Sequence, residues 1–272
     1  MKLSGALSFV LLALSALEQV VAASIPSDRF SIRRRASAGK RDNDNDSDPQ
    51  SSLKLDPSQV QTGLEQDGNS AVPPDPNQVA SLTSSNNFIN FCLTQTGVPL
   101  TNGTQIKGGS CNPTIMGRVL STANLPSAKF QYPANLDTIP ANVNFTVQIA
   151  INNLETGFFT NATSNFFAAP AQVNDQGTLI GHSHVVIEKM DSLTSTTVPD
   201  PLVFAFFKGL NDPAVNGILS TVVTGGLPAG VYRASTINTA ANHQPPLASI
   251  AQHGSLDDQV YFTVSDDAGN QN

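Results

Sequence analysis

The 272-residue sequence contains no tryptophan and only three tyrosines, Tyr132, Tyr232 and Tyr261. Carbohydrate-binding modules stack exposed aromatic rings on sugars, so this shortage argues against such a module. The hydrophobic core must instead take much of its volume from the 14 phenylalanines. We therefore assign the apolar run Phe-Ala-Phe-Phe at residues 204–207 to the core rather than to a ligand site.

Charged side chains are also few, at 13% of the sequence, and acidic residues outnumber basic ones by 21 to 14. Half of the basic residues, but only two acidic ones, lie before residue 42. The chain from residue 42 onward therefore has a formal net charge of −12. Such an acidic chain is poorly suited to bind nucleic acid or anionic membranes.

The chain lacks an apolar run long enough to span a membrane. Its N-terminus instead has the parts of a signal peptide: Lys2, the apolar run Ala6–Leu14 and small residues up to Ala23. We expect residues 1–23 to be removed before Ser24, which predicts a secreted, extracellular protein. A buried N-terminal helix is the alternative. The polar C-terminus argues against a lipid anchor.

Three segments are predicted to lie outside the folded domain. Residues 24–41 form a pro-segment that ends at the dibasic pair Lys40 and Arg41, a candidate processing site; a basic patch that binds anions is the alternative. Residues 42–85 are rich in Ser, Pro, Asp, Gln and Asn, which predicts a disordered linker with a helical turn near residues 58–65. The polar tail, residues 266–272, is also predicted to be disordered.

The sequence has only two cysteines, Cys92 and Cys111. In an oxidising compartment such a pair predicts one disulfide that closes a short loop, with two free thiols as the alternative. Sequons of the form Asn-X-Ser/Thr, behind a signal peptide, predict a glycoprotein. The four acceptors are Asn45, Asn102, Asn144 and Asn161.

Residues 86–265 have the pattern of one mainly β domain. Residues 145–151 alternate apolar and polar side chains with period two, as in a half-buried strand. Further strands are predicted at 181–188, 202–207, 230–237 and 260–264, a turn at 137–141 and a short helix around 213–224. Short strands separated by turns predict an immunoglobulin-like β-sandwich with a disulfide-closed N-terminal extension.

Six motifs resemble a family of fungal secreted proteins. They are Asn86–Cys92, Gly108–Pro113, Gly181–His184, Phe206–Pro213, Asn242–Pro245 and Gln252–Gly254. The resemblance runs from about Leu53 to Val264. That family is uncharacterised, and its members are sometimes labelled ribosomal, which conflicts with export and with the acidic charge. The resemblance implies a fungal extracellular origin and no particular activity.

A second likeness covers residues 181–250. Gly-His-x-His, then Leu-Pro-Ala-Gly with an aromatic residue, then Asn-His with prolines, is similar to a bacterial immunoglobulin-like domain family rich in histidine. This likeness implies a fold only.

All four histidines lie in the C-terminal part of the chain. His182 and His184 are two residues apart on a predicted strand, so both imidazoles lie on one face and can bind one metal ion. His243 and His253 are candidate further ligands. Copper or zinc suits imidazole. Three acidic residues are candidates either for oxygen ligands or for hydrogen-bond partners of the ligating histidines: Glu188, Asp257 and Asp258. The alternative is structural, with the histidines bonded to backbone groups.

The sequence assigns no catalytic residue and leaves open whether the protein is an enzyme. It has no Gly-x-Ser-x-Gly elbow, and Ser255 lies too close in sequence to His253 and Asp257 for a catalytic triad. The leading hypothesis is a secreted fungal protein that acts by binding. The candidate partners are cell-wall polysaccharide and a host protein, and a protein that binds a host protein would be an effector candidate. The alternative is a copper- or zinc-binding protein or metalloenzyme that uses the histidine cluster.

Overall fold

A computed structural model describes residues 48–67 and 80–268. The chain divides into two units at Lys54, and the second unit holds every helix and strand discussed below. The predicted signal peptide, pro-segment, dibasic site and Asn45 sequon lie outside the described residues, as does residue 269 onward. The predicted domain boundaries therefore stay predictions.

The N-terminal part of the second unit contains short 3-10 helices connected by loops. These are η1 (Pro57–Gln59), η2 (Thr62–Glu65), η3 (Phe91–Thr94) and η4 (Thr122–Asn124). The helical turn predicted near residues 58–65 is confirmed as η1 and η2. The side chain of Asn87 donates to the Gln59 carbonyl at 2.5 Å and accepts from the Gln61 amide at 2.9 Å, which ties residues 59–61 to residue 87.

A disulfide joins Cys92 at η3 to Cys111, with the Cα atoms 5.7 Å apart. The predicted bridge is therefore confirmed. Backbone hydrogen bonds between residues 99–101 and Cys111 close the same loop.

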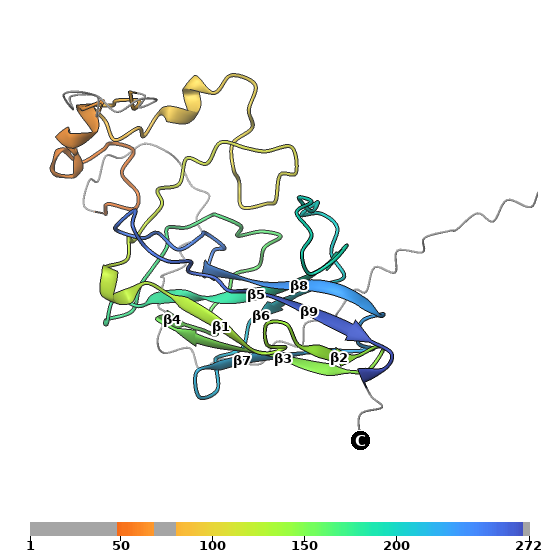
Figure 1. The fold of residues 1–272 in the computed structure, drawn as a ribbon. Helices are drawn as coiled ribbons and strands as arrows, with labels where there is room; N and C mark the ends of the chain where they lie inside the picture. The colour runs from red at the N-terminus through yellow and green to blue at the C-terminus, as the bar shows by residue number, and fades with distance from the viewer. Residues whose placement is uncertain (1–47, 68–79, 269–272) are drawn as a thin grey trace, which may run out of the picture. The chain divides into compact units, whose positions relative to one another are not determined.

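The described structure is mainly β and contains two sheets (Figure 1). The strands are β1 (Ser127–Tyr132), β2 (Thr138–Pro140), β3 (Phe145–Asn152), β4 (Leu154–Glu155), β5 (Leu179–Met190), β6 (Phe206–Leu210), β7 (Ile218–Val223), β8 (Gly230–Ala240) and β9 (Gln259–Ser265). The smaller sheet has the order β1-β3-β7. The larger has the order β2-β9-β8-β5-β4, with β6 also paired to β5.

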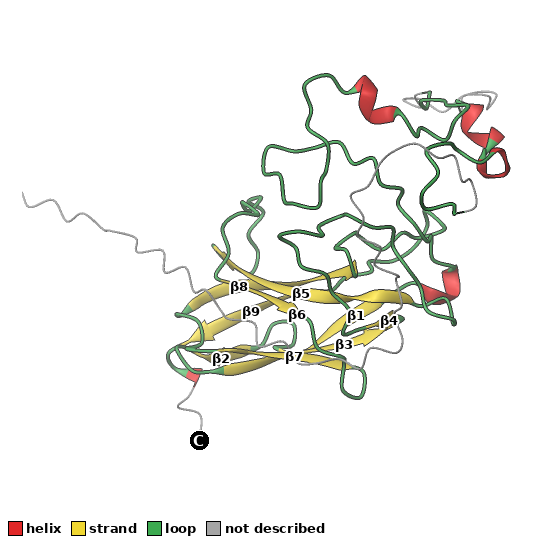
Figure 2. Cartoon of the chain, turned by 180° about the vertical axis from the view of Figure 1, so that it is seen from behind, coloured by secondary structure: helices red, strands yellow, loops and turns green. Residues whose placement is uncertain are grey.

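The two sheets enclose one hydrophobic core. The predicted alternation in β3 is confirmed: Phe145, Val147, Ile149 and Ile151 are buried, and the polar residues between them are exposed. The same buried cluster includes β5, β8 and β9 side chains of the larger sheet. The ring of Phe145 meets that of Phe262 edge-on, with centroids 6.5 Å apart. Figure 2 shows the strands of the two sheets as separate layers.

Three local predictions were wrong. The helix expected around residues 213–224 is strand β7, which pairs antiparallel with β3. Its β-branched residues suit a pleated strand, and Gly217 and Gly225, both with positive φ, form turns at its ends. The turn expected at 137–141 is β2, because its backbone pairs in parallel with β9.

The third error concerns residues 202–207. The strand begins only at Phe206, where pairing with β5 starts, and the preceding residues form a turn. Phe204 and Phe207 are 50% and 48% exposed, so they lie outside the core, whereas the half-buried Phe206 packs against it. Phe204 and Phe207 form part of the surface beside β5.

Strand β5 presents two different faces. Val185 and Ile187 belong to the core cluster. Since successive side chains of a strand alternate, His182, His184 and Glu188 point to the opposite, outer face of the larger sheet. Figures 1 and 2 show loops that follow β4 and β8 on this outer side of the sheet. These loops cover the histidine end of β5.

Candidate metal centre

The site begins with the pair His182 and His184 on the outer face of β5. Their ring centroids are 4.8 Å apart with an interplanar angle of 89°. His182 is fully buried and His184 is half-buried. The prediction that both imidazoles share one face is confirmed by the strand geometry.

His243 joins this pair from the turn that follows β8. Gly181 pairs with Ala240 in the register of β5 and β8, so the residues after Ala240 lie beside the start of the Gly-His-Ser-His segment. The His243 amide donates to the Ala240 carbonyl at 2.9 Å, and His243 has a φ of 71°. This left-handed turn directs the chain back over the sheet.

The three imidazoles form one compact group. The centroid of His243 lies 4.7 Å from that of His182 and 5.8 Å from that of His184. One ring nitrogen from each residue can be chosen so that the three lie within 4.8 Å of one another. Among the described residues, no carboxylate or thiolate belongs to this group.

Backbone carbonyls hold two of the rings. The Nδ1 of His182 lies 3.1 Å from the Phe158 carbonyl, and the Nε2 of His243 lies 2.9 Å from the Thr160 carbonyl. Since a carbonyl only accepts, these nitrogens donate, which leaves a lone pair on Nε2 of His182 and on Nδ1 of His243. Histidines that bind metals usually have their second ring nitrogen held in this way.

A short loop supplies both carbonyls. The Phe158 amide donates to the Gly181 carbonyl, the Thr160 amide donates to the Ala241 carbonyl, and the Phe167 amide donates to the Asn242 carbonyl. The segment 158–167 is thus attached by backbone hydrogen bonds to the two segments that carry the histidines. Nothing in the sequence alone indicated these contacts, because they are made by main-chain atoms.

The electrostatic surroundings keep two of these imidazoles neutral. Burial, with the neighbouring His184 and His243, lowers the pKa of His182 to about 3. Burial and His243 lower the pKa of His184 to about 4. Both imidazoles are therefore unprotonated at neutral pH, which is the state that binds metal.

Each imidazole is also backed by a phenylalanine. Phe159 meets His182 at 6.2 Å between centroids, Phe166 meets His243 at 5.5 Å, and Phe207 lies nearly parallel to His184 at 5.3 Å. Thr239, opposite His182 on β8, places its hydroxyl 3.3 Å from both ring nitrogens of His182. Sequence analysis did not find these neighbours.

The other candidate ligands do not join the group. His253 is exposed, and its Nδ1 lies 2.6 Å from the Gly254 carbonyl. Glu188 accepts two hydrogen bonds from Arg233, at 2.9 and 2.6 Å. Asp257 accepts from the Thr236 hydroxyl and the Asn238 amide. Asp258 accepts from Lys129 and the Phe130 amide. These carboxylates have structural partners.

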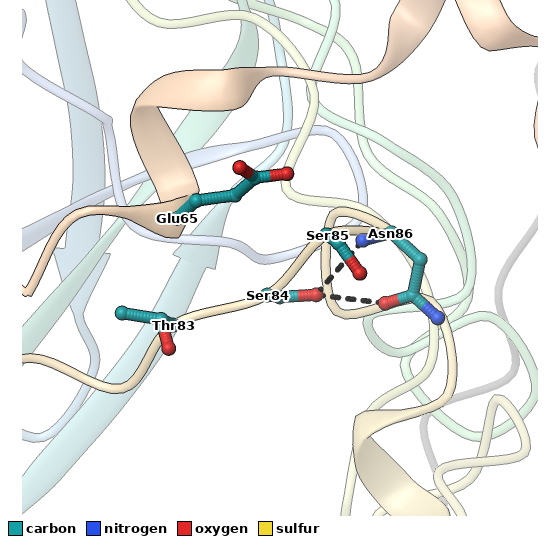
Figure 3. Close-up of a pocket in the computed structure, with 5 residues that line it drawn as sticks. All are labelled: Glu65, Thr83, Ser84, Ser85 and Asn86. Atoms are coloured by element: carbon teal, nitrogen blue, oxygen red, sulfur yellow. Dashed lines mark hydrogen bonds between the residues drawn. The ribbon is translucent and has the colours of Figure 1, made fainter.

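A separate polar pocket lies in the N-terminal part of the second unit, with a volume of about 420 Å³. Figure 3 shows its lining residues, Glu65, Thr83, Ser84, Ser85 and Asn86. The Ser84 hydroxyl bonds the Asn86 side chain at 2.7 Å. The pocket contains no histidine and does not include the three-imidazole group.

The three described sequons are on the surface. Asn102, Asn144 and Asn161 are all exposed. The Ser255 hydroxyl donates to the Asp257 carbonyl at 2.7 Å. Among the described residues, no helix is long and apolar enough to cross a bilayer.

The described chain is a mainly β protein with a three-histidine group on the outer face of its larger sheet. Residues 128–265 match the family described as the CLU5d N-terminal domain, and the chain belongs to this family. The matched region extends from β1 to the end of β9 and contains all four histidines. This finding agrees with the resemblance to an uncharacterised fungal family.

A named relative is pathogenicity cluster 5 protein d of Colletotrichum graminicola (strain M1.001 / M2 / FGSC 10212). It is 45% identical over 214 residues, which cover 78% of this chain. The chain spans 43% of that relative's length.

Proposed function

We propose that this chain is a secreted fungal protein that binds copper or zinc through His182, His184 and His243. The observation that carries this proposal is the group of three ring nitrogens within 4.8 Å of one another. In two of the rings one nitrogen donates to a carbonyl, which leaves the other nitrogen of each ring with the lone pair that a metal needs.

Metal binding requires the three rings to move closer together. Nitrogen ligands lie ~2.0–2.1 Å from zinc, so three of them around one ion lie roughly 3.3–3.6 Å apart. Ring nitrogens up to 4.8 Å apart therefore have to approach by as much as about 1.5 Å, which rotation of the half-buried His184 and His243 side chains would supply. His253 is not part of this proposed site.

The biological setting is supported by the named relative. Its name assigns it to a pathogenicity cluster, which favours a host-interacting role for this chain as well. We propose that the protein acts outside the fungal cell by binding, to a host protein or to wall polysaccharide. Metal binding would then serve this role, or host interaction would be an independent function of the same domain.

We further propose that the two sheets form an immunoglobulin-like sandwich. Support comes from Tyr232, whose hydroxyl donates to the Pro228 carbonyl four residues earlier at 2.8 Å. Immunoglobulin-like domains contain such a tyrosine corner at the start of a strand. The residues Leu227–Tyr232 that make this contact were part of the sequence pattern that suggested the fold.

Secretion, processing and glycosylation are also proposals. Exposed Asn102, Asn144 and Asn161 are accessible to the glycosylation machinery. A mass spectrum of the protein secreted from a fungal host, with and without glycosidase treatment, would show whether the chain starts after Arg41 and which sequons carry glycan. Retention of residues 1–23 in the purified protein would contradict secretion through a cleaved signal.

Elemental mass spectrometry of the purified protein tests the metal site. We expect close to one copper or zinc per chain after loading, and loss of that metal in the His182→Ala/His184→Ala variant. Since His182 is fully buried, the half-buried His243→Ala variant is measured beside it. His253→Ala is the matched control and should keep its metal. Absence of metal from the loaded parent protein would contradict the proposal.

A further inference from the structure

We propose that the three-histidine site is selective for monovalent copper, Cu(I), over zinc and Cu(II). This inference rests on the metal site proposed above and names the ion it would take. Three features support it: the charge of the ligand set, the number of ligands and the apolar surroundings.

The ligand set is neutral. Three imidazoles contribute no charge, and no carboxylate or thiolate among the described residues belongs to the group. With Cu(I) the site would hold one net positive charge, and with Zn²⁺ or Cu²⁺ it would hold two. The cost of burying an ion grows with the square of its charge, so a divalent ion pays roughly four times as much desolvation as a monovalent one.

Nearby acids do not offset that charge. Glu188, on the same face of β5, is paired with Arg233 by two hydrogen bonds to one carboxylate oxygen. Asp257 is held by Thr236 and by the Asn238 amide. Divalent sites in proteins usually include anionic ligands or hydrogen-bonded carboxylates behind the imidazoles. Here the ring nitrogens of His182 and His243 that donate to the backbone do so to carbonyl oxygens, which carry no formal charge.

The number of ligands also favours Cu(I). Zinc in proteins is almost always four-coordinate, so a three-histidine site must leave one position to water or substrate. Zn²⁺ and Cu(I) both have a filled d shell, but Cu(I), with its lower charge, is stable with only two or three nitrogen ligands. The described residues supply three, and the group includes no fourth histidine, cysteine or carboxylate.

The walls of the site further disfavour a hydrated ion. Phe159, Phe166 and Phe207 each contact one of the three imidazoles. His182 is fully excluded from solvent. A coordinated water needs hydrogen-bond partners, and the three phenylalanine rings offer none, so a water ligand on zinc or Cu(II) would have few partners besides the Thr239 hydroxyl.

Competition titrations test this selectivity on the full secreted chain. Cu(I) is titrated without oxygen, in ascorbate, against bicinchoninate. Zinc is titrated against a chromogenic chelator and Cu(II) against nitrilotriacetate. We expect one Cu(I) per chain, bound at least ~100-fold more tightly than zinc, because of the charge difference described above. X-ray absorption at the copper edge should show three nitrogen ligands.

Matched variants assign that binding to the site. His184→Ala and His243→Ala, both at half-buried positions, should lose most Cu(I) affinity, and His253→Ala should not. Thermal unfolding of the metal-free variants checks that they are folded. Zinc or Cu(II) bound as tightly as Cu(I) would overturn this inference and leave the metal site intact. No binding of any of the three ions would overturn both.

Discussion

The imidazole planes of His184 and His243 lie within 6° of parallel, with their centroids 5.8 Å apart, and His182 stands nearly perpendicular to both. Strand β5 supplies two of these rings, and the turn after β8 supplies the third. Lone pairs on nearly parallel rings converge on one point only if the rings share a plane or one of them rotates. In the proposed metal site, rotation of the His184 ring would therefore affect metal affinity.

Gly209 is expected to preserve that freedom. It pairs with His184 across β5 and β6, and an added Cβ would lie 3.5 Å from Cδ2 of His184 and 3.0 Å from Oδ1 of Asn211. We expect Gly209→Ala to leave the fold intact and weaken metal binding several-fold in the competition titration, because it restricts the ring. Gly254→Ala is the control, since an added Cβ there meets nothing within 4 Å. Equal affinity of the two variants would contradict this role.

The stability of the metal-free protein should depend on pH through the buried histidines. The pKa values of His182 and His184 are about 3 and about 4, against about 6.5 in an unfolded chain. Between these values the unfolded chain binds more protons, so this contribution to the free energy of unfolding is complete above pH ~6.5 and is lost as the pH falls toward 3–4.

We expect the free energy of unfolding, measured in urea with EDTA present, to be lower at pH 4.5 than at pH 7 by roughly 2 kcal/mol for each of the two histidines. His184→Gln removes one of the two titrating groups and should flatten the profile. A profile of the same slope in this variant would show that other groups cause the acid sensitivity.

The tyrosine corner should contribute to stability. Tyr232 is 1% exposed, and its hydroxyl donates to the Pro228 carbonyl. Tyr232→Phe keeps the ring contact with Phe262 and removes one hydrogen bond, which should cost about 1 kcal/mol of unfolding free energy. Tyr132→Phe serves as the control because its ring also packs against the core, at Phe145. Chemical denaturation of both variants is the measurement, and a loss no larger for Tyr232→Phe than for Tyr132→Phe would contradict the prediction.

The ion pair of Glu188 and Arg233 is expected to matter more than a surface pair. Their side chains are 7% and 19% exposed, and the shortest contact is 2.6 Å. Glu188→Gln leaves the guanidinium partly buried without its counter-charge, which should cost about 3 kcal/mol. The double variant Glu188→Leu/Arg233→Met should recover much of that loss, because it buries no unpaired charge.

Lys129 and Asp258 provide the comparison for this pair. Lys129 is 62% exposed, so Lys129→Met should change the free energy of unfolding by less than ~1 kcal/mol. Urea midpoints of the three variants give all values in one experiment. If Glu188→Gln and Lys129→Met have similar effects, burial does not determine the strength of these pairs.

The alternation of apolar and polar residues along the sequence correctly predicted the longer, more regular strands. Residues 145–151 alternate strictly and form β3, and the β-branched segments near residues 185, 235 and 262 form β5, β8 and β9. The segment 218–223 is short and mixes apolar residues with Ser220 and Thr221, which fits a strand as well as a helix, and only its pairing with β3 decides between them. Strand β2 has three residues including Pro140, so it could be recognised only from its distant partner β9.

The candidate site also combines features set by neighbouring residues with features set by distant ones. Period two was enough to place His182 and His184 on one face, since that depends on neighbouring residues alone. The inclusion of His243 depends on the register of β5 with β8, and the position of His253 away from the group depends on a loop conformation. The contacts made by the carbonyls of Phe158 and Thr160 could not be predicted from the sequence, because every residue has a backbone carbonyl.

The parallel pairing of β2 with β9 has a consequence for synthesis of the chain. Thr138 pairs with Thr263, so β2, which is synthesised early, can pair only after β9 has been synthesised. Strand β9 also covers one edge of β8. A nascent chain that stops short of residue 259 would leave two strand edges unpaired at once, and such edges invite association with other chains. The domain is thus expected to complete its folding only after residues 259–265 have left the ribosome, and the unpaired edges of β2 and β8 stay exposed until then.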